Sequence, residues 1–146
     1  MLICDALFSS LFYRAVHLDQ GNGMIGYMTL GTNDIEKARE FYDALLAEMG
    51  AGRILSGDNL TIWGTTPNSG MLGVIKPFDG EAATIGNGTM AAIPVASPEM
   101  VGKMHAKALS LGGSDEGAPG PRGTRNTEFC YCRDPEGHKL AFYCMV

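Results

Sequence analysis

Apolar residues follow two spacings along this chain, and each spacing predicts a different kind of element. Short apolar runs at 25–31 and 88–95 predict two strands. After each run, apolar residues recur every three or four positions, which is typical of a helix with one buried face. The residues that would share that face are Ala38, Phe41, Leu45 and Met49 in the first helix, and Val101, Met104, Ala108 and Leu111 in the second.

Capping residues and glycines bound both predicted helices. Asn33, with Glu36 three residues later, is typical of a capping box, and Ser97 followed by Pro98 is a second helix start. Both helices are expected to end at glycines, namely Gly50 with Gly52 and Gly112 with Gly113.

Two hairpins are predicted after the helices, because turn residues separate pairs of apolar runs. The predicted hairpin strands are 60–66 with 71–78, and 127–133 with 138–146. A weaker strand is expected after each helix, near 51–56 and 114–118. The composition of 117–126, GAPGPRGTRN, predicts a loop.

The chain contains an internal repeat. Sliding the sequence by 63 residues superposes the two strand–helix halves, and sliding it by 68 superposes the two hairpins. Each half reads β-α-β-β-β, over about 24–80 for the first module and 86–146 for the second. We expect an α+β fold in which the modules form a curled, eight-stranded mixed sheet with helices outside. The inner face of such a cup is a cleft, and clefts bind small molecules.

Residues 1–23 are expected to be an appendage to a single domain at 24–146. They lack the basic start and the cleavage site of a signal peptide. A linker-like stretch at 20–23 separates them from Met24. We therefore expect a chain that begins at Met24 to fold.

Composition narrows the function classes. The net charge is −5 and the 11 Lys and Arg residues form no run, which argues against nucleic acid and against an anionic membrane surface. The spacing of Cys130 and Cys132 is not that of a CxxC site, so two small core residues on one strand face are expected. Free thiols in a reducing compartment are the expectation, and the predicted location is the cytoplasm.

Three stretches of the sequence together resemble the vicinal oxygen chelate superfamily, which includes glyoxalase I, bleomycin-resistance proteins and extradiol dioxygenases. They are TLGTNDIEKAREFYDALL, VASPEMVGKMHAKALSLGG and RDPEGHKLAFY, and the resemblance covers about 24–146. GNGTM, KPFDG and GAPGPRG are similar to a glyoxalase-like subgroup without an established activity. The resemblance implies the paired-module fold, but the superfamily hosts many reactions and some proteins that are not enzymes.

Metal-using members of this family hold a divalent cation with His, Glu or Gln at four positions, on the first and last strands of each module. Carried over one at a time, those positions are Tyr27, Gly73, Met90 and Ala141. None of the four is a conventional ligand for Zn²⁺, Ni²⁺, Fe²⁺ or Mn²⁺. We therefore expect no metal at the family's usual site, and no cofactor.

Strand alternation predicts what lines the cup, once Tyr27 and Ala141 are set inward. The candidate ligand-binding residues are Tyr27, Trp63, Met90, Phe129, Tyr131, Ala141 and Tyr143, with Arg122 at the rim. Trp63 and Tyr131 are repeat partners and are expected to form opposing walls. Such walls favour a flat or apolar ligand. The alternative is that these side chains fill a closed core.

Few residues are candidates for acid–base chemistry, and no catalytic residue is assigned. His17 lies in the appendage, His105 is expected to be a partly exposed helix residue, and His138 is expected to point out of the cup. Arg122 and Arg125, in the glycine-rich loop, could grip a carboxylate or phosphate, or could serve only as surface charge.

Three functions remain open. The first is a metal-free protein that binds an apolar or aromatic small molecule, as the drug-resistance members of the family do. The second is an enzyme, either a glyoxalase-type lyase or isomerase or a dioxygenase, acting on a small carbonyl or aromatic substrate, with Tyr27 or Lys139 carrying any metal-free chemistry. The third is a role in binding a partner protein. A homodimer is expected, with no nucleic-acid or membrane partner.

Overall fold

The structure is a computed structural model that describes residues 24–67, 69–123 and 126–145. The first half contains β1 (Tyr27–Gly31), α2 (Ile35–Leu46), η1 (Ala47–Met49), β2 (Gly52–Ser56), β3 (Leu60–Gly64) and β4 (Met71–Ile75). The second contains β5 (Met90–Pro94), α3 (Pro98–Ser110), β6 (Ser114–Pro121), β7 (Thr127–Arg133) and β8 (Lys139–Met145). The predicted β-α-β-β-β order is confirmed in both halves. The expectations for the segment 1–23 and for Arg125 lie outside the described residues.

The strands form two four-stranded mixed sheets, in the orders β1-β4-β3-β2 and β5-β8-β7-β6. The predicted α+β fold with eight strands is confirmed, and among the described residues these strands are divided between two sheets rather than joined in one. The ladders stop at β1 in one sheet and at β5 in the other. Pro94 at the end of β5 has no backbone N–H to donate, so this strand suits a sheet edge.

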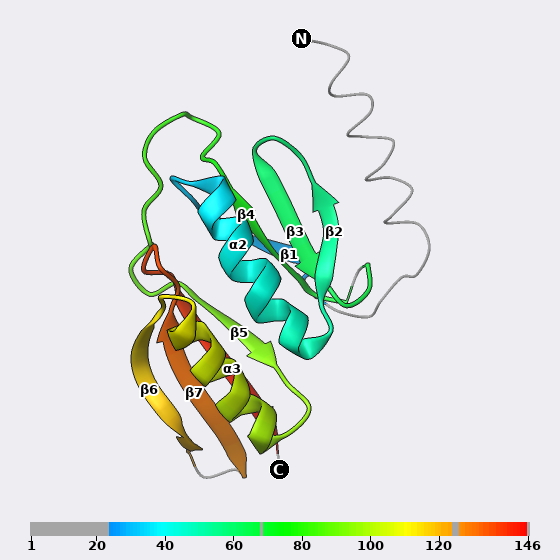
Figure 1. Cartoon of the computed structure of the whole chain (residues 1–146), viewed down its shortest axis with the longest axis vertical. Coiled ribbons are helices and arrows are strands. Elements are labelled where there is room, and N and C mark those ends of the chain that lie inside the picture. The colour runs from blue at the N-terminus through cyan, green and yellow to red at the C-terminus, as the bar shows by residue number, and fades with distance from the viewer. Residues whose placement is uncertain (1–23, 68, 124–125, 146) are drawn as a thin grey trace.

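Both helices lie on the same side of the molecule, each in front of its own sheet (Figure 1). One continuous core fills the space between helices and sheets. In the second module, Met104 and Ala108 on α3 have no exposed surface and pack in the same cluster as Leu140 and Phe142 on β8. We call the opposite side of each sheet, which neither of the two described α-helices covers, its open face.

The helix starts were predicted correctly for α3 and one residue too early for α2. Ser97 caps α3, and its side chain accepts a hydrogen bond from the Met100 N–H. Asp34, rather than Asn33, caps α2. The Asn33 amide instead exchanges two hydrogen bonds with the backbone of Ala83, at 2.8 and 3.2 Å, and so holds the connection between the modules.

Strand β6 extends to Pro121, through half of the segment predicted to be a loop. Its register against β7 shifts twice, between Asp115 and Gly117 and again between Gly117 and Gly120. The Gly and Pro residues that suggested a loop are tolerated because β6 is an edge strand, which leaves one row of backbone groups unpaired.

A turn in the second module connects it to the first. The Tyr42 hydroxyl donates to the Asp134 carboxylate at 2.7 Å, and the Asn33 N–H donates to Glu136 at 2.7 Å. On the helix side, Glu48 pairs with Lys103 at 2.7 Å and with Lys107 at 3.2 Å. These contacts fix how the two modules sit against each other.

Candidate functional site

The open face of the second sheet is identified by which strand residues contact α3. The Cys130 thiol donates to the Val101 carbonyl of α3 at 3.5 Å, so even-numbered residues of β7 face the helix. Phe129 and Tyr131 therefore lie on the open face, together with their ladder partners Tyr143 and Ala141. This arrangement agrees with the predicted inward set for this module.

Three aromatic rings stack side by side on that face, and we call Phe129, Tyr131 and Tyr143 the aromatic cluster. The Phe129 and Tyr143 ring centroids are 5.1 Å apart with an interplanar angle of 14°. Those of Phe129 and Tyr131 are 5.8 Å apart at 12°. All three side chains are half-buried rather than enclosed. The near-parallel rings are offset-stacked with Phe129 in the middle, and they form an apolar row that is partly open to solvent.

Small residues flank the aromatic cluster in the same row of the sheet. Tyr131 pairs with Ala141, which pairs with Ala92 on β5 and is itself completely inaccessible to solvent. On the other side, a Cβ at Gly117 would come within 2.9 Å of the Tyr131 ring. Glycine at position 117 therefore lets the ring lie close to β6. Ala141, predicted to bind ligand, is covered by its neighbours and offers no accessible surface.

Two cations lie beside the ring of Tyr131. The Lys139 Nζ is 5.2 Å from the ring centroid and the Arg122 Cζ is 6.0 Å from it. Arg122 also donates to the backbone carbonyls of Ala118 and Pro121, both at 3.0 Å. Its predicted place at the edge of the aromatic surface agrees with this geometry.

Trp63 faces α2 and not the open face, so its expected place as a wall opposite Tyr131 is wrong, whereas its role in binding a ligand stays a prediction. Its indole N–H donates to Asp43 of α2 at 2.8 Å, its ring packs against Tyr42 with centroids 5.5 Å apart, and it is 1% exposed. The first hairpin explains the error. Ile62 pairs with Gly73, eleven positions away, whereas Tyr131 pairs with Ala141, ten positions away. One extra residue in a hairpin exchanges the faces of the strand, so Ile62 takes the place equivalent to Tyr131.

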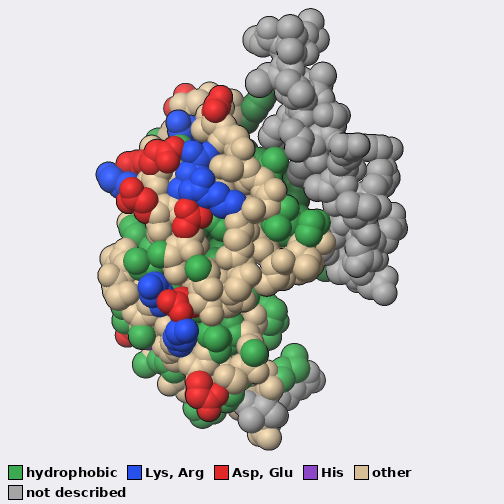
Figure 2. All heavy atoms as spheres, turned by 45° about the vertical axis from the view of Figure 1, so that its right-hand side comes forward, with side chains coloured by type: hydrophobic (Ala, Val, Ile, Leu, Met, Phe, Trp, Pro, Cys, Tyr) green, Lys and Arg blue, Asp and Glu red, His purple; other side chains and the backbone are tan. Residues whose placement is uncertain are grey.

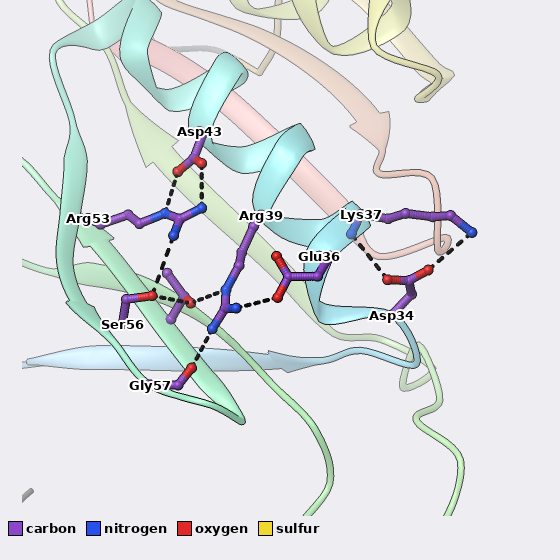
Figure 3. A network of polar contacts seen from close by, with 9 residues as sticks. Asp34, Glu36, Lys37, Arg39, Asp43, Arg53, Ser56 and Gly57 are labelled. Atoms are coloured by element: carbon purple, nitrogen blue, oxygen red, sulfur yellow. Dashed lines mark hydrogen bonds and ion pairs between the residues drawn. The ribbon is translucent and has the colours of Figure 1, made fainter.

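A polar network holds α2 against the outer side of the first sheet (Figure 3). Arg53 donates to both oxygens of Asp43, at 2.9 and 2.6 Å, and this pairing holds the pKa of Asp43 below its usual value. Arg39 donates to the Thr61 hydroxyl at 2.8 Å and to the Gly57 carbonyl. These residues have partners within the module, so the network is structural.

Tyr27 and Met90 lie at the sheet edges and are 43% and 40% exposed. A largely apolar hollow of about 430 Å³ separates the modules nearby, lined by residues that include Met28, Leu72 and Ile93. Figure 2 shows the molecule hollowed between its two halves, with hydrophobic side chains along the described parts of that hollow.

The four positions that carry metal ligands in metal-using relatives do not fit a metal here. A Cβ at Gly73 would lie 3.2 Å from the Thr29 Cγ2 and 3.3 Å from the Ile62 Cγ1, so apolar atoms crowd this position. Ala141 offers only a methyl group. Among residues 24–67, 69–123 and 126–145, no group of three or more His, Cys, Asp or Glu side chains could hold a metal ion.

Both described histidines are buried, and the expectation of a partly exposed His105 is wrong. His105 is 8% exposed, and its Nε2 lies 2.9 Å from the Asp115 carboxylate. His138 faces away from the open face, as predicted, but is 4% exposed and donates from Nε2 to the Gly31 carbonyl at 2.6 Å. Their partners lie on other elements, Asp115 on β6 and Gly31 on β1, which local sequence patterns do not reveal.

The paired cysteines of β7 are core residues, as predicted. Burial raises the pKa of Cys130 to about 11 and that of Cys132 to about 12. Both thiols therefore stay protonated at neutral pH and are poor nucleophiles. Within the part of the chain that the structure describes, no helix is long and apolar enough to cross a membrane.

Comparison with known proteins agrees with the fold. The model of the Glyoxalase/Bleomycin resistance protein/Dioxygenase superfamily matches residues 24–142. A solved glyoxalase/bleomycin resistance protein from Albidiferax ferrireducens is 32% identical with a TM-score of 0.77, and the match covers 85% of this chain and 100% of that chain. A lactoylglutathione lyase from Agrobacterium tumefaciens is 17% identical with a TM-score of 0.61, covering 86% of this chain and 96% of that chain. No curated protein matches the chain.

Proposed function

The chain belongs to the glyoxalase/bleomycin resistance protein/dioxygenase superfamily, and from that premise we propose that it binds a flat, apolar or aromatic small molecule without a metal ion. The observation that supports this function is the aromatic cluster on the open face of the second sheet. A planar ligand can continue this stack against an outer ring of the row, and such stacking needs no particular polar group. The positions of Gly73 and Ala141 are crowded, and their side chains offer no donor atom for a metal, which supports binding without a metal ion.

Titration with neutral bicyclic and tricyclic aromatics, 2-naphthamide among them, tests the proposal. We expect saturable binding of one ligand per chain, with a large loss of affinity in the variant Tyr131→Ala. Phe78→Ala is the matched control, because Phe78 is fully exposed on the connection between the modules. The proposal fails if no member of the panel binds at millimolar concentration, or if both variants bind as the parent does.

A second candidate is an enzyme of the glyoxalase type, a lyase or isomerase. Lys139 favours it, because an ammonium group on the open face beside Tyr131 could serve in proton transfer. Turnover of the methylglyoxal–glutathione adduct, lost in Lys139→Gln, would support this function. Saturable ligand binding without any turnover would support the binding function and contradict the enzyme function.

A homodimer in the cytoplasm is part of the proposal. Exposed apolar side chains at the sheet edges, Tyr27 and Met90 among them, would be covered by a second copy. The described cysteines, Cys130, Cys132 and Cys144, are free, which suits a reducing compartment. Light scattering at micromolar concentration checks the dimer, and a monomeric mass would contradict it.

A further inference from the structure

Positive charge gathers at one end of the aromatic cluster, and we propose that the ligand of this face is an aromatic carboxylate whose anionic group binds at Lys139 and Arg133. This inference rests on the proposed binding function and names the class of ligand. It is argued from the register of the sheet, from a hollow beside it, and from the balance of charge around the two cations.

The ladder places the cations one row away from the small residues beside the aromatic cluster. Arg133 pairs with Lys139, which pairs with Met90, so all three side chains share the open face. The next row contains Tyr131 and Ala141. Neighbouring positions on one face of a strand are two residues apart, or about 7 Å. A bicyclic ligand stacked beside Tyr131 can therefore extend its carboxylate to Lys139.

A hollow of about 590 Å³ lies against this charged row. Its lining includes Arg133, Lys139 and Met90, together with the loop 85–89 from the connection between the modules. Two glycines give the loop its fold, Gly86 with a φ of 65° and Gly88 with a φ of 88°. Space for an anionic group therefore exists where the cations are.

The cations outnumber the carboxylates that they contact. Arg133 donates to Glu116 at 2.5 Å, and the same carboxylate lies 3.7 Å from the Lys139 Nζ. That second separation exceeds hydrogen-bond length, so Lys139 is the less engaged of the two cations. Counting Arg133, Lys139 and Glu116 leaves one positive charge, and Arg122 beside Tyr131 adds a second.

The sign of this local charge is opposite to that of the whole chain, whose net charge is −5. Glu116 has its pKa lowered by Arg133, so it stays ionised and its charge is already included in the balance. A carboxylate on the ligand carries a single negative charge, which matches the one excess charge on the Arg133 and Lys139 pair.

Matched acid and amide ligands test the inference. In the parent chain we expect 2-naphthoate to bind about tenfold more tightly than 2-naphthamide, the effect of one hydrogen bond to a charged group. The preference should fall as salt is added, because part of the interaction is between solvent-exposed charges. In Lys139→Gln the two ligands should bind with nearly equal affinity.

Lys37→Gln is the control, since it removes the same charge from a side chain that is 81% exposed near the start of α2. It should keep the full preference for the acid. If 2-naphthoate and 2-naphthamide bind equally to the parent chain, the inference is wrong while the proposed binding function stands. If no aromatic ligand binds, both are wrong. The acid-to-amide ratio and its salt dependence in the parent chain test the inference even if Lys139→Gln does not fold.

Discussion

The glycine at position 73 has no free space around its α-carbon. A Cβ built there would lie 3.2 Å from both the Thr29 Cγ2 and the Thr61 carbonyl oxygen. Contacts this short require the neighbours to move, and all three of the nearest atoms belong to β-branched side chains or to backbone. By contrast, a Cβ at Gly102 on α3 would meet no atom within 4 Å. Replacement of these two glycines by alanine is therefore expected to change stability in opposite directions.

Gly73→Ala should lower the free energy of unfolding by about 1–3 kcal/mol, because it overpacks the centre of the first sheet. Gly102→Ala should raise it by up to about 1 kcal/mol, because alanine favours a helix and open space receives the methyl group. Urea unfolding of the two variants checks both values. Equal effects of the same sign would show that the crowding at position 73 relaxes without cost.

The sequence predicts correctly which face of a sheet a residue lies on where alternation along a single strand decides it. Phe129 and Tyr131 alternate with Cys130 and Cys132, so the aromatic and cysteine faces of β7 were separated correctly. The face on which Trp63 lies was inferred from a neighbouring strand, and that inference was wrong because it depends on the length of the hairpin. His105 was predicted wrongly for a different reason, since its ring pairs with Asp115 from β6, which helix periodicity does not show.

The positions of the helices and strands are set largely by local patterns, so the sequence predicts them well. Helix starts, hairpins and the repeat followed from caps, turns and apolar spacing, and the errors were small. The cap of α2 moved from Asn33 to Asp34, and β6 continued to Pro121. In both cases a contact from another segment decided the outcome, Ala83 for Asn33 and the strand β7 for β6.

Ser97→Ala should lower the free energy of unfolding by about 1 kcal/mol, because the Met100 N–H loses its acceptor at the start of α3. Part of the effect should depend on pH, because the Ser97 hydroxyl also lowers the pKa of Glu99. Asp34→Ala should also destabilise, but only where the carboxylate is ionised. The Lys37 backbone N–H lowers the pKa of Asp34 in the folded chain, so its contribution is present above the usual value of 3.8 and disappears as the pH falls through the folded pKa.

Thermal unfolding of both variants and of the parent chain between pH 2 and pH 7 separates the two caps. The Ser97→Ala curve should stay below the parent curve even in acid, because the bond to the Met100 N–H does not titrate, although the gap should narrow below pH 4.5 as Glu99 is protonated. The Asp34→Ala curve should approach it as the solution becomes acidic. A constant offset for Asp34→Ala would mean that its charge contributes nothing to capping.

At the scale of the whole molecule, two separate sheets are joined by a buried polar contact. Tyr42, which is 1% exposed, donates to Asp134, which is 5% exposed. The sequence did not predict this junction, nor the end of each ladder at β1 and β5. The Tyr42–Asp134 contact joins residues 92 positions apart, and the ends of the ladders depend on which distant strands pair. Neither periodicity nor turn chemistry carries a signal for such pairings.

Tyr42→Phe should lower the free energy of unfolding by about 1–3 kcal/mol at neutral pH, because one oxygen of the buried Asp134 loses its donor. Burial, and then the Asp134 charge, raise the pKa of Tyr42 well above its ordinary value of 10.0. The stability that Tyr42 contributes is therefore complete below pH 10 and is lost as the pH rises beyond it.

Urea unfolding of the parent and the variant from pH 7 to pH 11 checks the expectation. The parent should lose stability above pH 10 more steeply than Tyr42→Phe, so that the difference between them narrows. A difference that stays constant would show that the Tyr42 hydroxyl does not titrate on unfolding.

The extra residue in the first hairpin also bears on how duplicated genes diverge. A tandem duplication begins with two equivalent aromatic walls, and insertion of a single codon in one hairpin turn is enough to exchange the faces of a strand. The aromatic side chain of that copy, here Trp63, then joins the core, while the other copy keeps its aromatic surface. One insertion can thus divide labour between the halves, with one copy specialising in stability and the other in recognition.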